Sequence, residues 1–87
     1  MRVRSLAVIF PTRNNSGQIR DHLIHAKSWI DLASEIIVVD SSTDDTLDIC
    51  RSLLPGHTKI IRHPPGLYAS WNAAIQSVES EFLYIST

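Results

Sequence analysis

Four short apolar runs alternate along the chain with segments whose apolar residues recur at helical spacing. The runs occupy residues 3–10, 35–39, 58–62 and 81–86. Continuous apolar runs bounded by turn residues are typical of strands buried on both faces, as in a parallel sheet covered by helices. The pattern therefore predicts strands and helices in strict alternation, with a strand at each end.

The segment after the first run predicts a helix over residues 16–32. Its apolar stripe consists of Ile19, Leu23, Ala26 and Ile30. This spacing places the four side chains on one face of a helix. Asn15 and Gln18 stand at the positions of a capping box, in which each side chain bonds the backbone N–H of the other residue. We therefore expect this helix to start directly after Asn15.

Two further helices are predicted from shorter stripes. The second stripe consists of Leu47, Cys50 and Leu54, and the third consists of Leu67, Trp71, Ile75 and Val78. Ser42 or Thr43 is the predicted N-cap of the second helix. Asp44 and Asp45 would then lie in its first turn, where the helix dipole favours carboxylates.

These elements predict the α/β class, as a three-layer α/β/α sandwich with a four-stranded parallel sheet. Crossovers between parallel strands are right-handed almost without exception, and they place helices on both faces of the sheet. Ligands of such sheets bind beyond the carboxyl ends of the strands. Three polar stretches fall at that edge, over residues 11–16, 40–45 and 63–72. The sequence therefore predicts a ligand site there.

Composition limits the classes of function. The 87 residues suffice for one small domain, and the net charge of −1 is spread without a basic cluster, so nucleic acid is not an expected partner. The single cysteine, Cys50, falls on a predicted apolar helix face and fits a core residue in a reducing compartment. The apolar run at residues 6–10 is too short for a signal-peptide core or a membrane span. We predict a cytoplasmic protein without a transmembrane segment.

Three segments of the chain resemble the start of a family 2 glycosyltransferase of the GT-A fold. They are AVIFPTRNN at residues 7–15, EIIVVDSSTDDTLDI at residues 35–49 and GLYASWNAAI at residues 66–75, followed by EFLYIS. Their order and spacing agree with that family over nearly the whole chain. The resemblance implies a Rossmann-like half of the fold with strand order 3-2-1-4. It also implies a nucleotide-diphospho-sugar donor, whose nucleotide half these loops would hold.

The resemblance further implies which residues bind the nucleotide. These are Pro11, Thr12, Arg13, Asn14, Asp40, Ser41, Gly66, Trp71 and Asn72. Pro11 and Thr12 match the turn that lies along the base and ribose, and Asp40 matches a carboxylate that accepts hydrogen bonds from the nucleotide. A carboxylate offers only acceptors, which suits a uracil N–H or a ribose hydroxyl. Arg13 stands where an aromatic residue often stacks on the base, and Trp71 where many members carry an arginine.

The resemblance places the metal site outside the chain. In this family the D-x-D carboxylates that hold Mn²⁺ or Mg²⁺ follow the fourth strand, and this sequence ends at Thr87, with that strand. We therefore expect residues 1–87 to be an N-terminal, truncated part of a glycosyltransferase domain, without catalytic or metal-binding residues. A divalent cation is expected for the intact family member, and the acceptor is not specified. The alternative is an inactive truncated remnant that binds nucleotide weakly or not at all.

Simpler interpretations stay open for several polar residues. Asp44 and Asp45 fit charges at a helix start, and Asp40 fits a turn residue that bonds its own backbone two residues on. The histidines lack the spacing of a metal site, and His22 and His25 are expected to face solvent. A dinucleotide-binding turn and a phosphoacceptor receiver domain are disfavoured, because residues 12–14 lack the glycines of the first and the acidic residues of the second.

Overall fold

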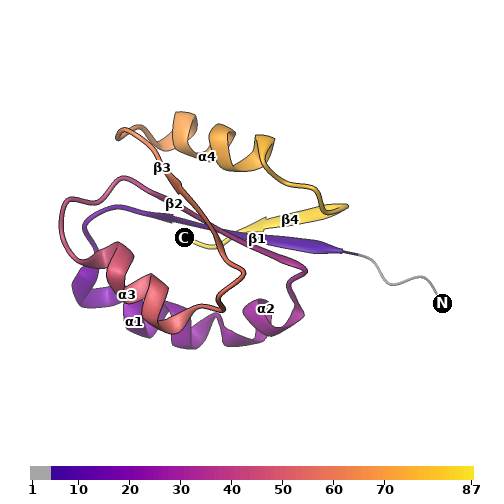
Figure 1. The fold of residues 1–87 in the computed structure, drawn as a ribbon, viewed down its shortest axis with the longest axis horizontal. Coiled ribbons are helices and arrows are strands. Elements are labelled where there is room, and N and C mark those ends of the chain that lie inside the picture. Colours follow the sequence, from indigo (N-terminus) through magenta and orange to yellow (C-terminus); the bar gives the residue numbers. More distant parts are fainter. Residues whose placement is uncertain (1–4) are drawn as a thin grey trace.

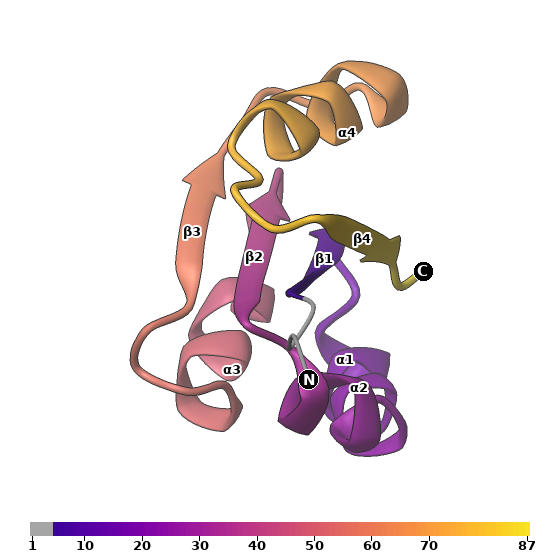
Figure 2. The same ribbon diagram turned by 90° about the vertical axis from the view of Figure 1, so that its right-hand side faces the viewer.

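The computed structural model describes residues 5–87 as a sheet with helices on both faces (Figure 1). The strands are β1 (Leu6–Thr12), β2 (Glu35–Asp40), β3 (Lys59–Arg62) and β4 (Phe82–Ile85). The helices are α1 (Ser16–His25), α2 (Lys27–Leu32), α3 (Thr46–Leu53) and α4 (Leu67–Gln76). Helices α1, α2 and α3 lie on one side of the sheet and α4 lies on the other, as Figure 2 shows. The predicted three-layer architecture is confirmed.

All strand pairs in the sheet are parallel, and their order is β3-β2-β1-β4, which confirms the expected order 3-2-1-4. The pairing of β1 with β2 continues to Thr12 opposite Asp40, whereas its pairing with β4 ends at Ile9. Pro11 therefore lies beyond the β4 ladder, where the missing N–H of a proline is tolerated. The first strand was expected over residues 3–10. It is shifted toward the carboxyl end, and residues 3 and 4 lie outside the described residues.

Alternate side chains of the two central strands fill two hydrophobic cores. The core beneath α1, α2 and α3 contains Val8, Phe10, Ile19, Leu23, Ala26, Ile36, Val38, Leu47, Cys50 and Leu54. The core beneath α4 contains Ile9, Ile37, Val39 and Ala74. Burial of one large apolar side chain stabilises a fold by about 1.5 to 3 kcal/mol. The first core therefore supplies most of the hydrophobic stability, and the first two predicted stripes are confirmed, with Ile30 only half-buried.

The helix predicted over residues 16–32 is divided in the structure. Ala26, with φ −85° and ψ 4°, separates α1 from α2. The Ile30 N–H still donates to the Ala26 carbonyl at 3.0 Å, so the chain direction is nearly preserved. Both helices are short, and none of the helices within residues 5–87 has the length and apolar character needed to cross a membrane.

The predicted capping box does not form. Asn15 is the N-cap of α1 and makes no side-chain cap hydrogen bond. Its φ of −119° and ψ of 37° lie outside the β region that N-caps favour. The Asn15 N–H donates to Thr46 Oγ1 at 3.0 Å. The prediction is wrong because the first side chain of α3 takes the backbone group that Gln18 was expected to bind.

Helix α3 begins later than the sequence pattern suggests. Its first residue is Thr46, and its N-cap is Asp45, which makes no side-chain cap hydrogen bond. Neither Ser42 nor Thr43 is therefore the N-cap, and Asp44 precedes the helix. The prediction is wrong because these residues bond the loop after β1, as described below.

Helix α4 faces the sheet with small side chains. Ser70 and Ala74 are buried, whereas Ile75 is 39% exposed and Trp71 is half-buried. The small side chains allow the helix backbone to approach the sheet closely. Val78, which follows the helix, packs against the second core. The predicted third stripe is therefore wrong at Ile75, and the side chain of Leu67 lies outside the described residues.

Candidate functional site

The loops that follow β1 and β2 are joined by Asn14. Its Oδ1 accepts the N–H of Thr43 at 2.8 Å and the N–H of Asp44 at 3.3 Å. Its own N–H donates to Ser42 Oγ at 2.9 Å. Asn14 has a φ of 48°, in the left-handed region that Asn adopts more readily than most residues. One residue in an uncommon conformation thus connects the two loops.

Asp44 and Thr46 strengthen this connection. Asp44 Oδ1 accepts the Thr46 N–H at 2.9 Å and its hydroxyl at 2.5 Å, while Thr46 Oγ1 accepts the Asn15 N–H. The hydroxyl and N–H of Thr46, and then the hydrogen bonds from Ser16, lower the pKa of the Asp44 carboxyl. The polar run at residues 40–45 is thus explained largely by bonds between two loops.

Asp40, the last residue of β2, is completely buried. Its Oδ1 accepts the Thr12 hydroxyl at 2.6 Å, and its Oδ2 accepts the Ser42 N–H at 3.1 Å. The guanidinium of Arg62 also donates to Oδ2. A buried carboxylate is tolerated when it is paired and hydrogen-bonded, and these donors satisfy that condition. Asp40 therefore caps its own turn, as one open interpretation predicted, and also links β2 to β1 and β3.

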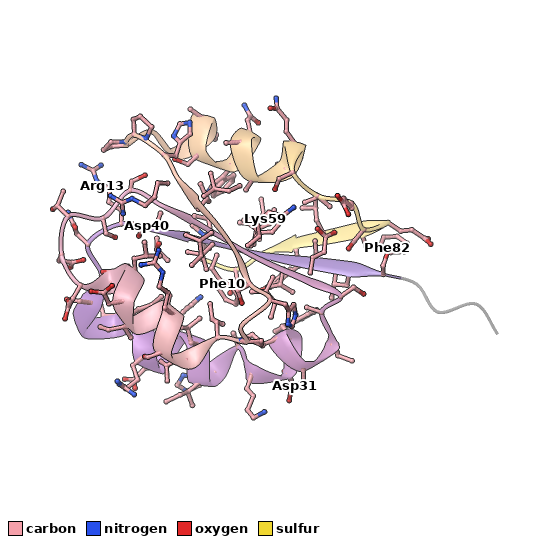
Figure 3. The ribbon with its side chains drawn as sticks, in the orientation of Figure 1. Phe10, Arg13, Asp31, Asp40, Lys59 and Phe82 are labelled. Atoms are coloured by element: carbon pink, nitrogen blue, oxygen red, sulfur yellow. The ribbon has the colours of Figure 1, made fainter. Side chains whose placement is uncertain are left out.

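A cavity of about 210 Å³ lies where the carboxyl ends of β1 and β2 meet the start of α4. It is lined by Pro11, Thr12, Arg13, Val39, Ser41, Gly66 and Ser70. Figure 3 shows Arg13 and Asp40 at the same end of the sheet, far from Phe82 at the other end. The structure thus gathers five of the nine candidate nucleotide-binding residues from three loops, namely Pro11, Thr12, Arg13, Ser41 and Gly66.

The other four candidates do not line this cavity. Asn14 joins the loops, and Asp40 is buried beside the cavity, where it holds the Thr12 hydroxyl. Trp71 packs edge-on against Tyr68, and its Nε1 is buried without a hydrogen-bond partner among the described residues. Asn72 is exposed on α4. These four side chains lie outside the surface of the cavity.

Two residues of this region were missed by sequence reasoning. Ser70 lines the cavity, and Arg62 binds the Asp40 carboxylate. Ser70 could have been found as a hydroxyl in the first turn of a helix that starts beside the other loops. Arg62 could have been found from the parallel register, since it lies directly opposite Asp40.

A second cavity of about 200 Å³ occupies the same edge, between β1, α1 and the end of β4. His22 lines it, with Nε2 3.0 Å from Ser86 Oγ and its ring edge-on to Phe10 at a centroid distance of 5.9 Å. The expectation that His22 faces solvent is therefore wrong. The side chain is half-buried and connects α1 to the carboxyl end of β4.

A larger cavity, of about 400 Å³, has a different character. It is lined by Leu23, Ile24, Lys27, Ile30, Asp31, Leu53, Leu54 and Pro55. These residues come from the end of α1, from α2, and from the end of α3 with the two residues that follow it, away from the carboxyl ends of the strands. Figure 3 shows Asp31 well separated from Arg13 and Asp40. Its lining is mostly aliphatic and lacks the convergent hydroxyl groups of the smaller cavity.

Residues 5–87 contain no group of three or more His, Cys, Asp or Glu side chains that could hold a metal ion. The described residues therefore do not fit the divalent cation expected for an intact family member, and no step of sugar transfer is assigned to such an ion here. Cys50 is buried, and this burial, followed by the charge of Asp40, raises the pKa of its thiol to about 11. It is a protonated core residue.

Residues 7–87 match the family described as Glycosyl transferase family 2. This chain is a member of glycosyl transferase family 2. The matched range includes β1 from its second residue onward, all three loops at the carboxyl edge of the sheet, and β4. The family 2 assignment thus covers both the fold and the cavity described above.

The family 2 chain also resembles two solved structures of glucosyl-3-phosphoglycerate synthase from Mycobacterium tuberculosis. The complex with phosphoglyceric acid superposes with a TM-score of 0.76 at 21% sequence identity. The complex with Mn²⁺, uridine-diphosphate and glucosyl-3-phosphoglycerate gives a TM-score of 0.74 at 22% identity. Each match covers 95% of this chain and 33% of the solved chain, so the family 2 chain spans about a third of their length. A search of curated proteins finds no match.

Proposed function

We propose that this chain supplies the nucleotide-binding half of a glycosyltransferase that uses a nucleotide-diphospho-sugar donor. The observation that carries the proposal is the convergence of three loops on the cavity of about 210 Å³ at the carboxyl edge of the sheet. Open α/β sheets bind ligands at this edge. Membership of family 2 supports the class of reaction, and one solved structure with the same fold contains uridine-diphosphate.

The size of the cavity points to one part of the donor. Its volume of about 210 Å³ is below the roughly 300 to 1,000 Å³ that holds a drug-sized ligand. We assign it to the base and ribose. Arg13 is exposed at its surface and can stack on a base or pair with a phosphate. The hydroxyls of Ser41 and Ser70 can donate to and accept from ribose hydroxyls.

The remaining parts of the donor and the acceptor are assigned to other parts of an intact enzyme. The described residues offer no cluster for Mn²⁺ or Mg²⁺, so the diphosphate and its cation need ligands from elsewhere. We propose that residues 1–87 act as the N-terminal part of a larger glycosyltransferase domain and catalyse no transfer alone. Incubation of the chain with nucleotide-sugars and Mn²⁺ should release nucleoside diphosphate no faster than a protein-free control.

The binding test is calorimetric titration of the chain with uridine-diphosphate, with guanosine-diphosphate as a second probe. Arg13→Ala removes a cation from the cavity surface without disturbing a buried side chain. Loss of a hydrogen bond to a charged group costs about 1.5 to 3 kcal/mol, so affinity should fall at least about tenfold. Arg20→Ala, which removes an exposed arginine on α1, is the matched control and should bind as wild type.

Two results would count against the proposal. Equal affinities of Arg13→Ala and wild type would place the nucleotide elsewhere. A chain that is folded by circular dichroism but binds neither nucleotide would support the alternative of an inactive remnant.

A further inference from the structure

Arg62 holds both neighbours of Ser41 without lining the cavity itself. Its Nη1 donates to the Asp40 carboxylate, and its Nη2 donates to the Ser42 carbonyl at 3.0 Å. Asp40 and Ser42 flank Ser41, which lines the cavity. The guanidinium therefore spans the turn on which this lining residue stands. It reaches the turn from the neighbouring strand, since Arg62 is the last residue of β3 and lies opposite Asp40 in the parallel register.

The same contact extends to a second lining residue. The Asp40 carboxylate that Arg62 binds also accepts the Thr12 hydroxyl at 2.6 Å. Within residues 5–87, Arg62 is the cation in contact with this completely buried carboxylate. Its own side chain is 57% exposed and lines a separate hollow of about 350 Å³ with residues 63–65 and 41–43. Arg62 thus acts on the cavity from outside it.

Replacement of Arg62 by lysine can distinguish positioning of the turn from simple balance of the Asp40 charge. A guanidinium is a planar fork that can bond two acceptors in fixed directions, whereas an ammonium is a compact point charge on a flexible stem. Lysine at position 62 could balance the Asp40 charge, but it could not bond the Ser42 carbonyl in the same geometry. Arg62→Lys should therefore keep most of the stability and lose the fixed position of the turn.

We propose that Arg62 is a positioning residue for the nucleotide site, which fixes Thr12 and Ser41 through Asp40 and Ser42. This inference rests on the proposed function of the cavity. It assigns no contact between Arg62 and the nucleotide. The fixed turn keeps the Ser41 hydroxyl and the Thr12 oxygen in place before the ligand arrives, so the ligand loses less affinity to ordering of the site.

The test compares wild type, Arg62→Lys, Arg62→Ala and the control Arg51→Ala, which removes an exposed cation of α3. Affinity for uridine-diphosphate is measured by calorimetry, stability by urea unfolding, and amide hydrogen exchange of Ser42 by NMR without ligand. The Ser42 N–H donates to Asp40 and so reports directly on the turn. Arg62→Lys should bind about tenfold more weakly and exchange at Ser42 about tenfold faster, with a urea midpoint close to wild type.

Each result decides a separate point. Wild-type affinity in Arg62→Lys would overturn the positioning role, even if Ser42 exchanged faster. Unchanged exchange at Ser42 in both variants would also overturn it, because the turn would then not depend on Arg62. If wild type binds no nucleotide, the proposed function of the cavity fails. Exchange at Ser42 then still decides whether Arg62 holds the turn.

Discussion

The loops after β1 and β2 are held by each other's side chains, whereas the segment after β3 is held mainly at its ends. In the first pair, Asn14 bonds three residues of the opposite loop, which are Ser42, Thr43 and Asp44. Asp40 adds bonds from its carboxylate within the same region. The bonding is dense and passes between residues far apart in the sequence.

The segment after β3, residues 63–66, is anchored differently. The His63 N–H donates to the Asp40 carbonyl at 3.0 Å, and the Ser70 N–H donates to the Gly66 carbonyl at 2.9 Å. The two prolines between these anchors have no N–H to donate. Between these anchors the side-chain contacts are local, since His63 Nδ1 lies 2.7 Å from the Pro64 carbonyl oxygen and 3.4 Å from Ser70 Oγ.

The loops after β1 and β2 thus form a fixed side of the cavity, and the segment after β3 forms an adjustable side. Groups that are fixed before binding spare a ligand the cost of ordering them. We therefore expect the affinity for any nucleotide to depend on the loops after β1 and β2. The preference among nucleotides should depend more on the segment after β3, because its side of the cavity can repack around different ligands.

Removal of the Asp40 carboxylate should have the largest effect, because it breaks the fixed side at its centre. In Asp40→Ala, the Thr12 hydroxyl and the Ser42 N–H lose their acceptor, and Arg62 loses its partner. Each buried donor left unpaired costs about 1 to 3 kcal/mol. We expect the free energy of unfolding, measured in urea, to fall by about 2 to 4 kcal/mol.

Asp48→Ala is the matched control for this measurement. Asp48 is exposed on α3, with Oδ1 3.8 Å from Arg51 Nη1. Such surface ion pairs contribute little to stability, so the free energy of unfolding should change by less than about 0.5 kcal/mol. If Asp40→Ala lowered the free energy of unfolding no more than this control, the loops after β1 and β2 would not depend on the Asp40 carboxylate.

Substitution of Asn14 should have the next largest effect. Asn14→Ala removes the bonds of Oδ1 to Thr43 and Asp44. It also leaves an alanine at φ 48°, a backbone conformation that alanine adopts less readily than asparagine. Asn14→Gly removes the same bonds but tolerates this φ. We expect the free energy of unfolding in urea to fall by about 2 to 3 kcal/mol for Asn14→Ala and by about 1 kcal/mol less for Asn14→Gly. Equal losses would show that the left-handed backbone contributes no strain.

Pro65→Ala tests the adjustable side and should have a smaller effect. The substitution frees the backbone of the segment after β3 without removing a hydrogen bond to the network. It should lower the free energy of unfolding by less than about 1 kcal/mol, mainly through the entropy of the unfolded chain. The ratio of affinities for uridine-diphosphate and guanosine-diphosphate, expressed as a free energy, should change more than the free energy of unfolding does. If Pro65→Ala lowered the free energy of unfolding as much as Asp40→Ala, the two sides of the cavity would not differ in the way proposed.

Acid should weaken the fixed side slightly through Asp44. Its carboxyl pKa is lowered from 3.8, so its stabilisation is present above that value and is lost as the pH falls through the lowered value. Thermal midpoints of wild type and Asp44→Asn should therefore differ by a constant amount from about pH 7 to about pH 5 and converge toward about pH 2. Asp45→Asn controls for the loss of one exposed charge. A difference that grows on acidification would contradict the direction of this shift.

The alternation of strands and helices and the edge of the sheet with the polar loops could be predicted from patterns within single segments, whereas the strand order was implied by the family resemblance. Buried runs such as residues 35–39 identify strands, and polar residues that follow them collect at one edge of a parallel sheet. Pro11, Thr12 and Ser41 belong to these polar stretches, and they line the cavity at that edge.

The bond of Asp40 to the Ser42 N–H, two residues on, was predicted, but partners that lie in distant segments could not be. Capping preferences describe Asp44 and Asn15 by their near neighbours, but the structure bonds the Asn15 N–H to Thr46, 31 positions away. Similarly, hydrophobic spacing favoured Ile75 for the buried face of α4, whereas Ser70 and Ala74 allow a closer approach to the sheet. Local propensity was overruled by tertiary packing in each case.

We propose that the nucleotide binds in the cavity at the carboxyl ends of β1 and β2. The most direct test of this proposal is a titration of the ¹⁵N-labelled chain with uridine-diphosphate, followed by amide chemical shifts. We expect saturable shifts at Thr12, Arg13, Ser41, Gly66 and Ser70, with little change at the residues lining the larger cavity of about 400 Å³. Saturable shifts at Leu23 and Leu53 instead, or none in a folded chain, would contradict the claim.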